Sequence, residues 1–135
     1  MIQINWFAVI IAAIGYFMLG ALWFSPLVAG KYYDNALGFV RTKEMKWGAL
    51  YYVGPFVGCL ISSIATAFLM QMCSVSSSVE AIRLGFIVGV GYGLAVSVTN
   101  AINPNTPKPI MYGFATGGYH VLGNVLASII YFKLK

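Results

Sequence analysis

The residue of this chain best suited to chemistry is its single histidine, His120. It lies in an apolar segment, with Thr116 four residues before it and Asn124 four residues after it. Tyr112 and Ser128 continue the same spacing in the two directions. Because residues four apart are neighbours on a helix, this spacing predicts one slanted polar stripe.

The environment of the stripe leaves two interpretations open. Polar groups facing acyl chains are costly, so we expect the stripe to face protein or a water-filled cavity. In the first interpretation His120 and Asn124, joined by Asn100 from an antiparallel neighbouring helix, line a site or path for a small polar solute, a lipid headgroup or a proton. In the second they are interhelical hydrogen bonds, each contributing about 0.6 kcal/mol.

Few residues of this sequence could support catalysis. The only acids are Asp34, Glu44 and Glu80, which fall in loops or at a predicted helix start. No acid or cysteine lies within helical reach of His120 to form a nucleophile, base and orienting group. One histidine and three scattered acids do not suggest a metal site. We therefore expect no catalytic residue, no metal and no cofactor.

The composition identifies the solvent as lipid. The chain is 60% apolar and 8% charged, whereas soluble domains carry about 25% charged residues. The net charge is +5, but the basic residues lie at the edges of apolar runs. Phospholipid headgroups and the positive-inside rule explain this placement better than nucleic acid does. We expect membrane lipids as partners and no nucleic acid.

Four apolar stretches are long enough to cross a bilayer, which takes about 20 helical residues. Their length and continuous apolarity exclude barrel strands, so the fold class is all-α. We predict one transmembrane domain over 1–135, a multi-pass protein with four transmembrane helices at about 5–24, 47–72, 79–102 and 110–132. Ser77 and Glu80 form a capping box before the third span.

The connection from about Pro26 to Lys46 is the only long one. Its first half predicts a short interfacial helix that ends at Gly38. The first and third loops carry five basic residues and the opposite side carries three, which places both termini outside. The first set is Lys31, Arg41, Lys43, Lys46 and Lys108, and the second is Arg83, Lys133 and Lys135.

Small residues recur every fourth position in the second and third spans. The packing positions are Gly54, Gly58 and Ser62 in the second span, and Gly85, Gly89, Gly93 and Ser97 in the third. Such grooves let helices approach closely. We expect these two spans to pack on each other, with a helix of another subunit as the alternative occupant, and we expect a homo-oligomer. Cys59 and Cys73 are about 21 Å apart on one helix, too far for a disulfide, and are expected to be buried free thiols.

Two segments, "GALWFSPLVAGK" at 20–31 and "GGYHVLGNVLASIIYF" at 117–132, resemble a family of small bacterial and fungal membrane proteins, domain-of-unknown-function 1761. The resemblance rests on an aromatic-Ser-Pro ending to the first span and a Gly-Tyr-His motif in the last. It assigns the family-motif positions to Trp23, Ser25, Pro26, Gly30, Gly118, Tyr119 and His120. It implies a four-span architecture and no particular activity.

These observations together predict an integral membrane protein, located in a bacterial plasma membrane. Our first functional hypothesis is a passive pore or a binding site for a small polar solute or lipid headgroup, lined by the stripe. The second is an accessory or structural subunit whose grooves hold the helices of a membrane-protein partner.

Overall fold

The computed structural model describes residues 3–42 and 44–135, so Lys43, one of the basic residues counted above, lies outside the described residues. All regular elements in these two ranges are helical, which confirms the all-α class. The elements are α1 (Trp6–Trp23), α2 (Gly30–Leu37), α3 (Leu50–Met72), α4 (Ser78–Val88), the π-helix η1 (Gly89–Leu94), α5 (Ala95–Ala101) and α6 (Pro109–Leu134).

Local hydrogen bonds fix several of the helix ends. Asn5 caps α1 by accepting from the Ala8 amide, and Ser77 caps α4 by accepting from the Glu80 amide. Gly38 ends α2 in the left-handed conformation, with φ of 65°. That conformation is accessible to glycine without a Cβ clash. The predicted helix and its end at Gly38 are therefore present, while its position at the membrane interface stays a prediction.

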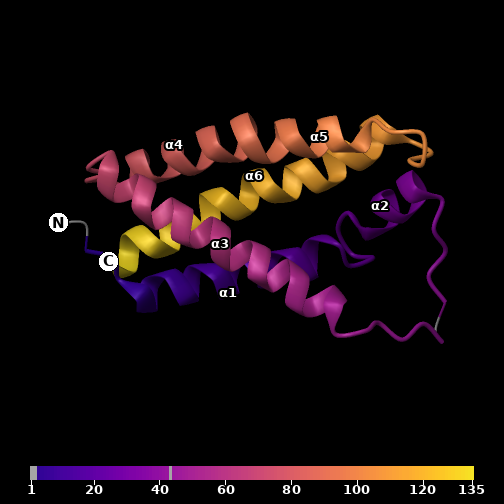
Figure 1. Cartoon of the computed structure of the whole chain (residues 1–135), viewed down its shortest axis with the longest axis horizontal. Coiled ribbons are helices and arrows are strands. Elements are labelled where there is room, and N and C mark those ends of the chain that lie inside the picture. The colour runs from indigo at the N-terminus through magenta and orange to yellow at the C-terminus, as the bar shows by residue number, and fades with distance from the viewer. Residues whose placement is uncertain (1–2, 43) are drawn as a thin grey trace.

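Helix α6 is the centre of the bundle, because it packs on all the other helices, chiefly α1, α4, η1 and α5. Figure 1 shows the two termini together at one end, with α2 and the connection from α5 to α6 at the other. The chain passes between these ends along α1, α3, the α4–η1–α5 segment and α6. The element order therefore alternates direction.

Three helical segments are long and apolar enough to cross a membrane: Trp6–Trp23, Leu50–Met72 and Ser78–Ala101. By length and composition, these helices suggest a membrane protein. Helix α6 has 26 residues, but its polar stripe lowers its hydropathy. Because it is surrounded by the other helices, its polar side chains can be shielded from acyl chains.

The third predicted span is not a uniform α-helix. The six residues Gly89–Leu94 form the π-helix η1 between α4 and α5. A π-turn bonds residue i to i+5 and is wider than an α-turn. Gly89 and Gly93 lie so close to α6 that a Cβ on them would come within 2.7 Å of Val121 Cα and 2.8 Å of His120 Cβ.

The expected packing of the second span on the third is wrong. Gly85 meets the backbone of α6, where a Cβ would lie 2.7 Å from the Asn124 carbonyl oxygen. Helix α3 instead packs mainly on α1 and touches α4 only marginally. Gly58 has no atom within 4 Å of its Cβ position. The glycine groove of the third span is filled by α6 because that helix brings its own small residues, Gly113 and Gly117, to the contact.

The two cysteines are free and lie in different environments. Cys59 is buried inside the bundle, as expected. The expectation that Cys73 is buried is wrong, because this residue caps the C-terminus of α3 at the end of the bundle and is exposed.

Candidate functional site: a polar cluster beside a groove

A cluster of three polar side chains lies inside the bundle. The Tyr16 hydroxyl of α1 is 2.8 Å from His120 Nδ1 of α6. Asn124 Nδ2 donates to the Tyr16 hydroxyl at 3.1 Å and to the His120 carbonyl at 2.7 Å. Tyr16 is 1% exposed. The cluster therefore ties α1 to α6 through groups that water reaches poorly.

The geometry assigns the direction of these hydrogen bonds. The Tyr16 oxygen accepts from Asn124, so its own hydrogen has two candidate acceptors, His120 Nδ1 at 2.8 Å and the His120 carbonyl at 3.4 Å. The shorter contact has the length of a normal hydrogen bond and the longer one does not. We therefore assign the tyrosine as donor to Nδ1, which leaves the imidazole proton on Nε2. No group of the described chain hydrogen-bonds Nε2.

The cluster forms the floor of a groove of about 310 Å³ between α3 and the π-helix. Ser62, Ala65 and Thr66 line it on the α3 side, and Tyr92 and Gly93 line it on the η1 side. Thr66 is 2% exposed. Tyr92 is 71% exposed, at the outer edge of the wall. The groove thus has mostly apolar sides with two hydroxyl-bearing residues on α3, a polar floor and an opening to the outside.

The π-helix shapes the wall that faces this floor. Gly93 sits directly over His120, and Leu94 lies against Gly117, where a Cβ would come within 2.9 Å of Leu94 Cα. Single π-turns inside α-helices are rare and occur often at functional sites. The position of η1 beside the only histidine therefore agrees with a site here.

The five residues of the predicted stripe do not share one cavity. Four residues on an α-helix advance about 40° beyond a full turn, so the stripe winds by about 160° from its first to its last member. Tyr112 packs its ring on Tyr33 of α2, and Thr116 bonds to carbonyls of its own helix. Ser128 is buried without a hydrogen-bond partner in the described part of the chain. Of the stripe, His120 and Asn124 line the groove.

The other residues predicted to line the site or to pack between helices also lie in different places. Asn100 is exposed near the end of α5 and does not line the groove. The prediction assumed that the third span and α6 are straight antiparallel neighbours and that Asn100 faces α6. Instead Gly113 meets Val98 and Ala101, which places Asn100 on another face. Ser97 is half-buried, and Ser62, predicted as a packing residue, lines the groove.

A second layer of aromatic contacts supports the cluster from the α1 side. The Tyr119 hydroxyl is 3.2 Å from Cys59 Sγ, and its ring lies 5.2 Å from that of Tyr16 and 5.3 Å from that of Phe24. Trp23 Nε1 donates to the Ala115 carbonyl at 2.8 Å. These contacts bring the two family-motif segments together and give their aromatic residues a packing role.

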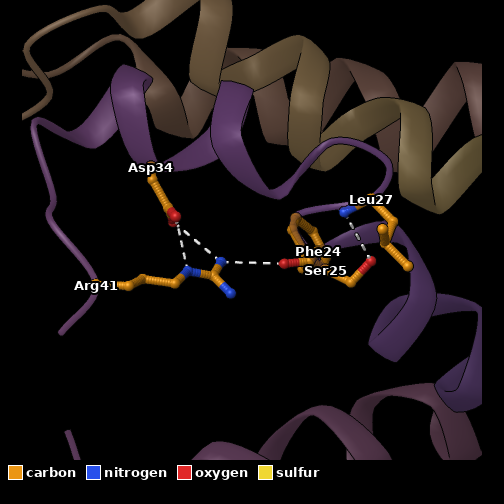
Figure 2. Close-up of polar contacts among 5 residues, drawn as sticks. All are labelled: Phe24, Ser25, Leu27, Asp34 and Arg41. Atoms are coloured by element: carbon orange, nitrogen blue, oxygen red, sulfur yellow. Dashed lines mark hydrogen bonds and ion pairs between the residues drawn. The ribbon is translucent and has the colours of Figure 1, made fainter. Parts of the chain in front are cut away.

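The turn after α1 is closed by an arginine from the following loop. Figure 2 shows Arg41 between Asp34 and the end of α1. Its Nε lies 2.7 Å from an Asp34 carboxylate oxygen, and Nη2 donates to the Phe24 carbonyl at 3.0 Å. Gly30 packs so tightly on this turn that a Cβ would overlap the Phe24 and Ser25 carbonyls. Glycine is therefore required at that position.

Helix α2 is also attached to α6. Lys108 donates its ammonium to Asn35 Oδ1 at 2.7 Å and its backbone amide to the Ala36 carbonyl at 3.1 Å. Burial, with the neighbouring Tyr112 hydroxyl adding to it, raises the pKa of Tyr33 to about 12. This tyrosine is therefore neutral throughout the physiological range, as its packing on Tyr112 requires.

Three residues of the site, Tyr16, Thr66 and Tyr92, were not predicted as lining residues from the sequence. Tyr16 and Thr66 are polar residues inside apolar spans, which is a signal that could have singled them out, as it did for His120. Tyr92 lies in "GVGYGL", but nothing in that string distinguishes a π-helix from an α-helix. The pairing of Tyr16 with His120 joins positions 104 apart in the sequence, which no local pattern reports.

The fold and the cluster define a class: small, all-helical proteins with helices long and apolar enough to cross a membrane and a hydrogen-bonded polar cluster in the interior. A family model described as "Protein of unknown function (DUF1761)" matches residues 7–132, nearly the whole chain, and the protein belongs to this family. No curated protein and no solved structure matches the chain.

Proposed function

We propose that this chain is an integral membrane protein with four transmembrane helices that binds a small, uncharged polar molecule in the groove between α3 and η1. The four spans are α1, α3, the segment from α4 to α5, and α6. The observation that carries the proposal is the Tyr16–His120–Asn124 cluster on the floor of a cavity of about 310 Å³. Ligand cavities start at about this size.

The depth of the cluster favours a solute over a lipid headgroup. His120 lies eleven residues after the start of α6 and fourteen before its end, or about 16 Å and 21 Å along the axis. A site at that depth is near the middle of a bilayer core of about 30 Å. Charged headgroups stay at the interface, so the groove suits an uncharged molecule.

A binding site is better supported than a pore. A pore would need a continuous polar lining, but the stripe winds around α6 and leaves only His120 and Asn124 on the groove. A binding role is also better supported than catalysis, because no described acid or cysteine hydrogen-bonds His120.

Helix–helix adhesion alone accounts for only part of the cluster. It explains the bonds among Tyr16, His120 and Asn124. It does not explain why His120 and Thr66 also line a cavity, with His120 Nε2 unbonded to the described chain. A few polar side chains placed on an otherwise apolar cavity are what orients a bound molecule in a ligand site.

Entry of small polar molecules can be tested by thiol reactivity. In a variant with Cys59→Ser and Cys73→Ser, Ser62→Cys places a thiol on the groove and Ile61→Cys places one on the lipid side, where Ile61 is 62% exposed. With a small water-borne thiosulfonate added to vesicles, we expect the cysteine at 62 to react at least tenfold faster. Equal protection of both would contradict the proposal.

We place α2 at the membrane interface. Leu27 and Val28 ahead of it are 87% and 50% exposed, and Tyr32 is 46% exposed. Apolar and aromatic side chains of this kind suit headgroup depth. A multi-pass protein of the bacterial plasma membrane remains our proposed location.

The second candidate function is an accessory subunit that packs on the helices of a membrane-protein partner or on further copies of itself. Its support is the α3 face with Gly54 and Gly58, whose Cβ positions have no atom of another helix within 4 Å. Small-residue faces let partner helices approach closely. Purification in mild detergent tests it: Gly58→Leu should abolish a homo-oligomer or release a co-purifying subunit. A protein that is monomeric and alone before the substitution would contradict this function.

A further inference from the structure

The side walls of the groove show which direction a ligand comes from. Ala65 and Leu69 on α3 face Val88 and Val96 on the third span, and Val96 is 54% exposed. These apolar walls lead outward to the face of the bundle that contacts acyl chains. A molecule dissolved in the membrane can therefore enter between α3 and η1 without passing through water.

The polar groups of the groove show what the ligand presents. The tautomer assigned above makes His120 Nε2 a hydrogen-bond donor on α6. Thr66 and Ser62 offer hydroxyl donors on α3, the adjoining side wall. Donors on the floor and on one side wall match a flat head that carries two hydrogen-bond acceptors. None of the described residues that line the groove carries a charge, so the head is uncharged.

We propose that the groove binds the head of a membrane-dissolved carbonyl compound of the isoprenoid quinone class, which enters sideways between α3 and η1. This rests on the proposed function and names its ligand. A quinone has two carbonyl acceptors on opposite sides of one planar ring and no charge. Its tail is as apolar as the groove walls, and Tyr92 at the rim offers an aromatic face to the ring.

Depth and size separate this class from other uncharged lipids. The hydroxyl of a sterol or a diacylglycerol stays near the interface, where water satisfies it. The cluster lies about 16 Å from the nearer end of α6, beyond the reach of such a group. The volume of about 310 Å³ is at the lower limit for ligand cavities, which suits a single substituted ring with its tail outside.

The test measures protection of a thiol in the groove. In vesicles containing the Ser62→Cys protein without its native cysteines, decylubiquinone is added before the water-borne thiosulfonate. Its ring has no free position for addition of the thiol. We expect at least a fivefold slowing of the reaction, because the bound ring covers position 62. Decylbenzene, with the same tail and no carbonyl groups, is the matched control and should give less than a twofold effect.

Two variants locate the interaction. His120→Phe keeps an aromatic ring at this position and removes the Nε2 donor, so it should reduce protection to the decylbenzene level while the thiol still reacts. Ala65→Phe fills the groove and should do the same, whereas Ile61→Phe, one turn away on the lipid side, should not. Protection that survives His120→Phe would overturn the inference, as would equal protection by decylbenzene.

The outcomes separate the inference from the proposed function. A reactive thiol at 62 that decylubiquinone does not protect leaves the groove as a solute site and overturns the quinone. If the thiol at 62 does not react at all, polar-solute entry fails, and photolabelling of the native protein with an azidoquinone decides the ligand. Labels on α3 or η1 that excess decylubiquinone removes would support it, and labels spread over the lipid-facing surface would overturn it.

Discussion

At the residue scale, the histidine is explained by what its two nitrogens do. Nδ1 accepts from Tyr16, and this bond orients the ring, while Nε2 stays free of the described chain and lines the groove. Asn124 completes the arrangement by donating to both Tyr16 and the His120 backbone. The two nitrogens of His120 thus have different roles: the protein fixes the position of Nδ1, and Nε2 is available to a ligand.

Removing the Tyr16 hydroxyl tests the cluster directly. Tyr16→Phe deletes an acceptor for Asn124 and leaves buried His120 Nδ1 without a donor. We expect the free energy of unfolding to fall by about 1–2 kcal/mol, measured by titration with a denaturing detergent. Tyr92→Phe removes an exposed hydroxyl with no partner in the described chain, and it should change stability by less than about 0.5 kcal/mol. Equal losses would contradict a structural role for the cluster.

At the element scale, the same four-residue spacing has different results in two helices. On regular α6 the polar stripe drifts around the axis, so Tyr112 and Ser128 leave the groove. In the third span the wider π-turn counteracts this drift. Gly85, Gly89 and Gly93 therefore all face α6. The four-residue spacing alone predicts that each set of residues shares one face of its helix. The π-turn preserves that shared face in the third span, and the regular α-helix of α6 does not.

A matched pair of substitutions tests this packing. Gly85→Ala puts a methyl group 2.7 Å from a carbonyl oxygen and 2.8 Å from Val125 Cα, so α4 and α6 must separate. We expect a loss of about 1–3 kcal/mol. Gly58→Ala meets no atom within 4 Å, and the gain in helix propensity should make it neutral or stabilising by up to about 1 kcal/mol. Detergent-induced unfolding measures both, and a similar loss for the two would refute the assigned interface.

The arginine between α1 and α2 is expected to order a loop rather than to stabilise the whole fold. The Arg41 side chain is 35% exposed, and ion pairs of that exposure contribute at most about 1 kcal/mol. Arg41→Ala should therefore change global stability little but raise the rate of chymotryptic cleavage at Phe39 and Trp47 severalfold. Lys31→Ala, which removes a charge without a partner in the described chain, is the control. Unchanged cleavage in Arg41→Ala would show that the loop is held by other contacts.

At the scale of the whole molecule, the sequence predicted the elements better than their partners. Apolar length gave the helices, and Gly38 and Ser77 marked two of their ends correctly. The helix partners were not predictable in the same way, because lipid provides no hydrophobic drive that ranks one small-residue groove above another. The groove of α3 and that of the third span look alike in sequence. Only the glycine positions of the third span lie against α6, whose Gly113 and Gly117 complete the contact.

The site was only half predictable for a related reason. His120 and Asn124 stand out because a polar group inside a span is costly unless it faces protein or a cavity. Their main partner, Tyr16, comes from the other end of the chain, and the cavity depends on α3 and η1 diverging over α6. Both depend on the final packing and not on any local pattern.

The basic residues are divided unequally between the two ends of the bundle. Lys31, Arg41, Lys46 and Lys108 lie at the α2 end, while Arg83, Lys133 and Lys135 lie toward the end with the termini. The four at the α2 end outnumber the three at the other, so from the positive-inside rule we expect the α2 end in the cytoplasm and both termini outside. Cys73 is exposed in the turn at the terminal end and Cys59 is 5% exposed.

A membrane-impermeant maleimide added to intact cells should therefore label the native protein at Cys73. Lys31→Cys combined with Cys73→Ser should be labelled only after the cells are permeabilised, because position 31 lies at the opposite end. Cys59 should stay unlabelled in both proteins, since its thiol is buried against Tyr119 inside the bundle. The reverse pattern, with Cys73 protected until permeabilisation, would show that the small charge excess does not determine orientation here.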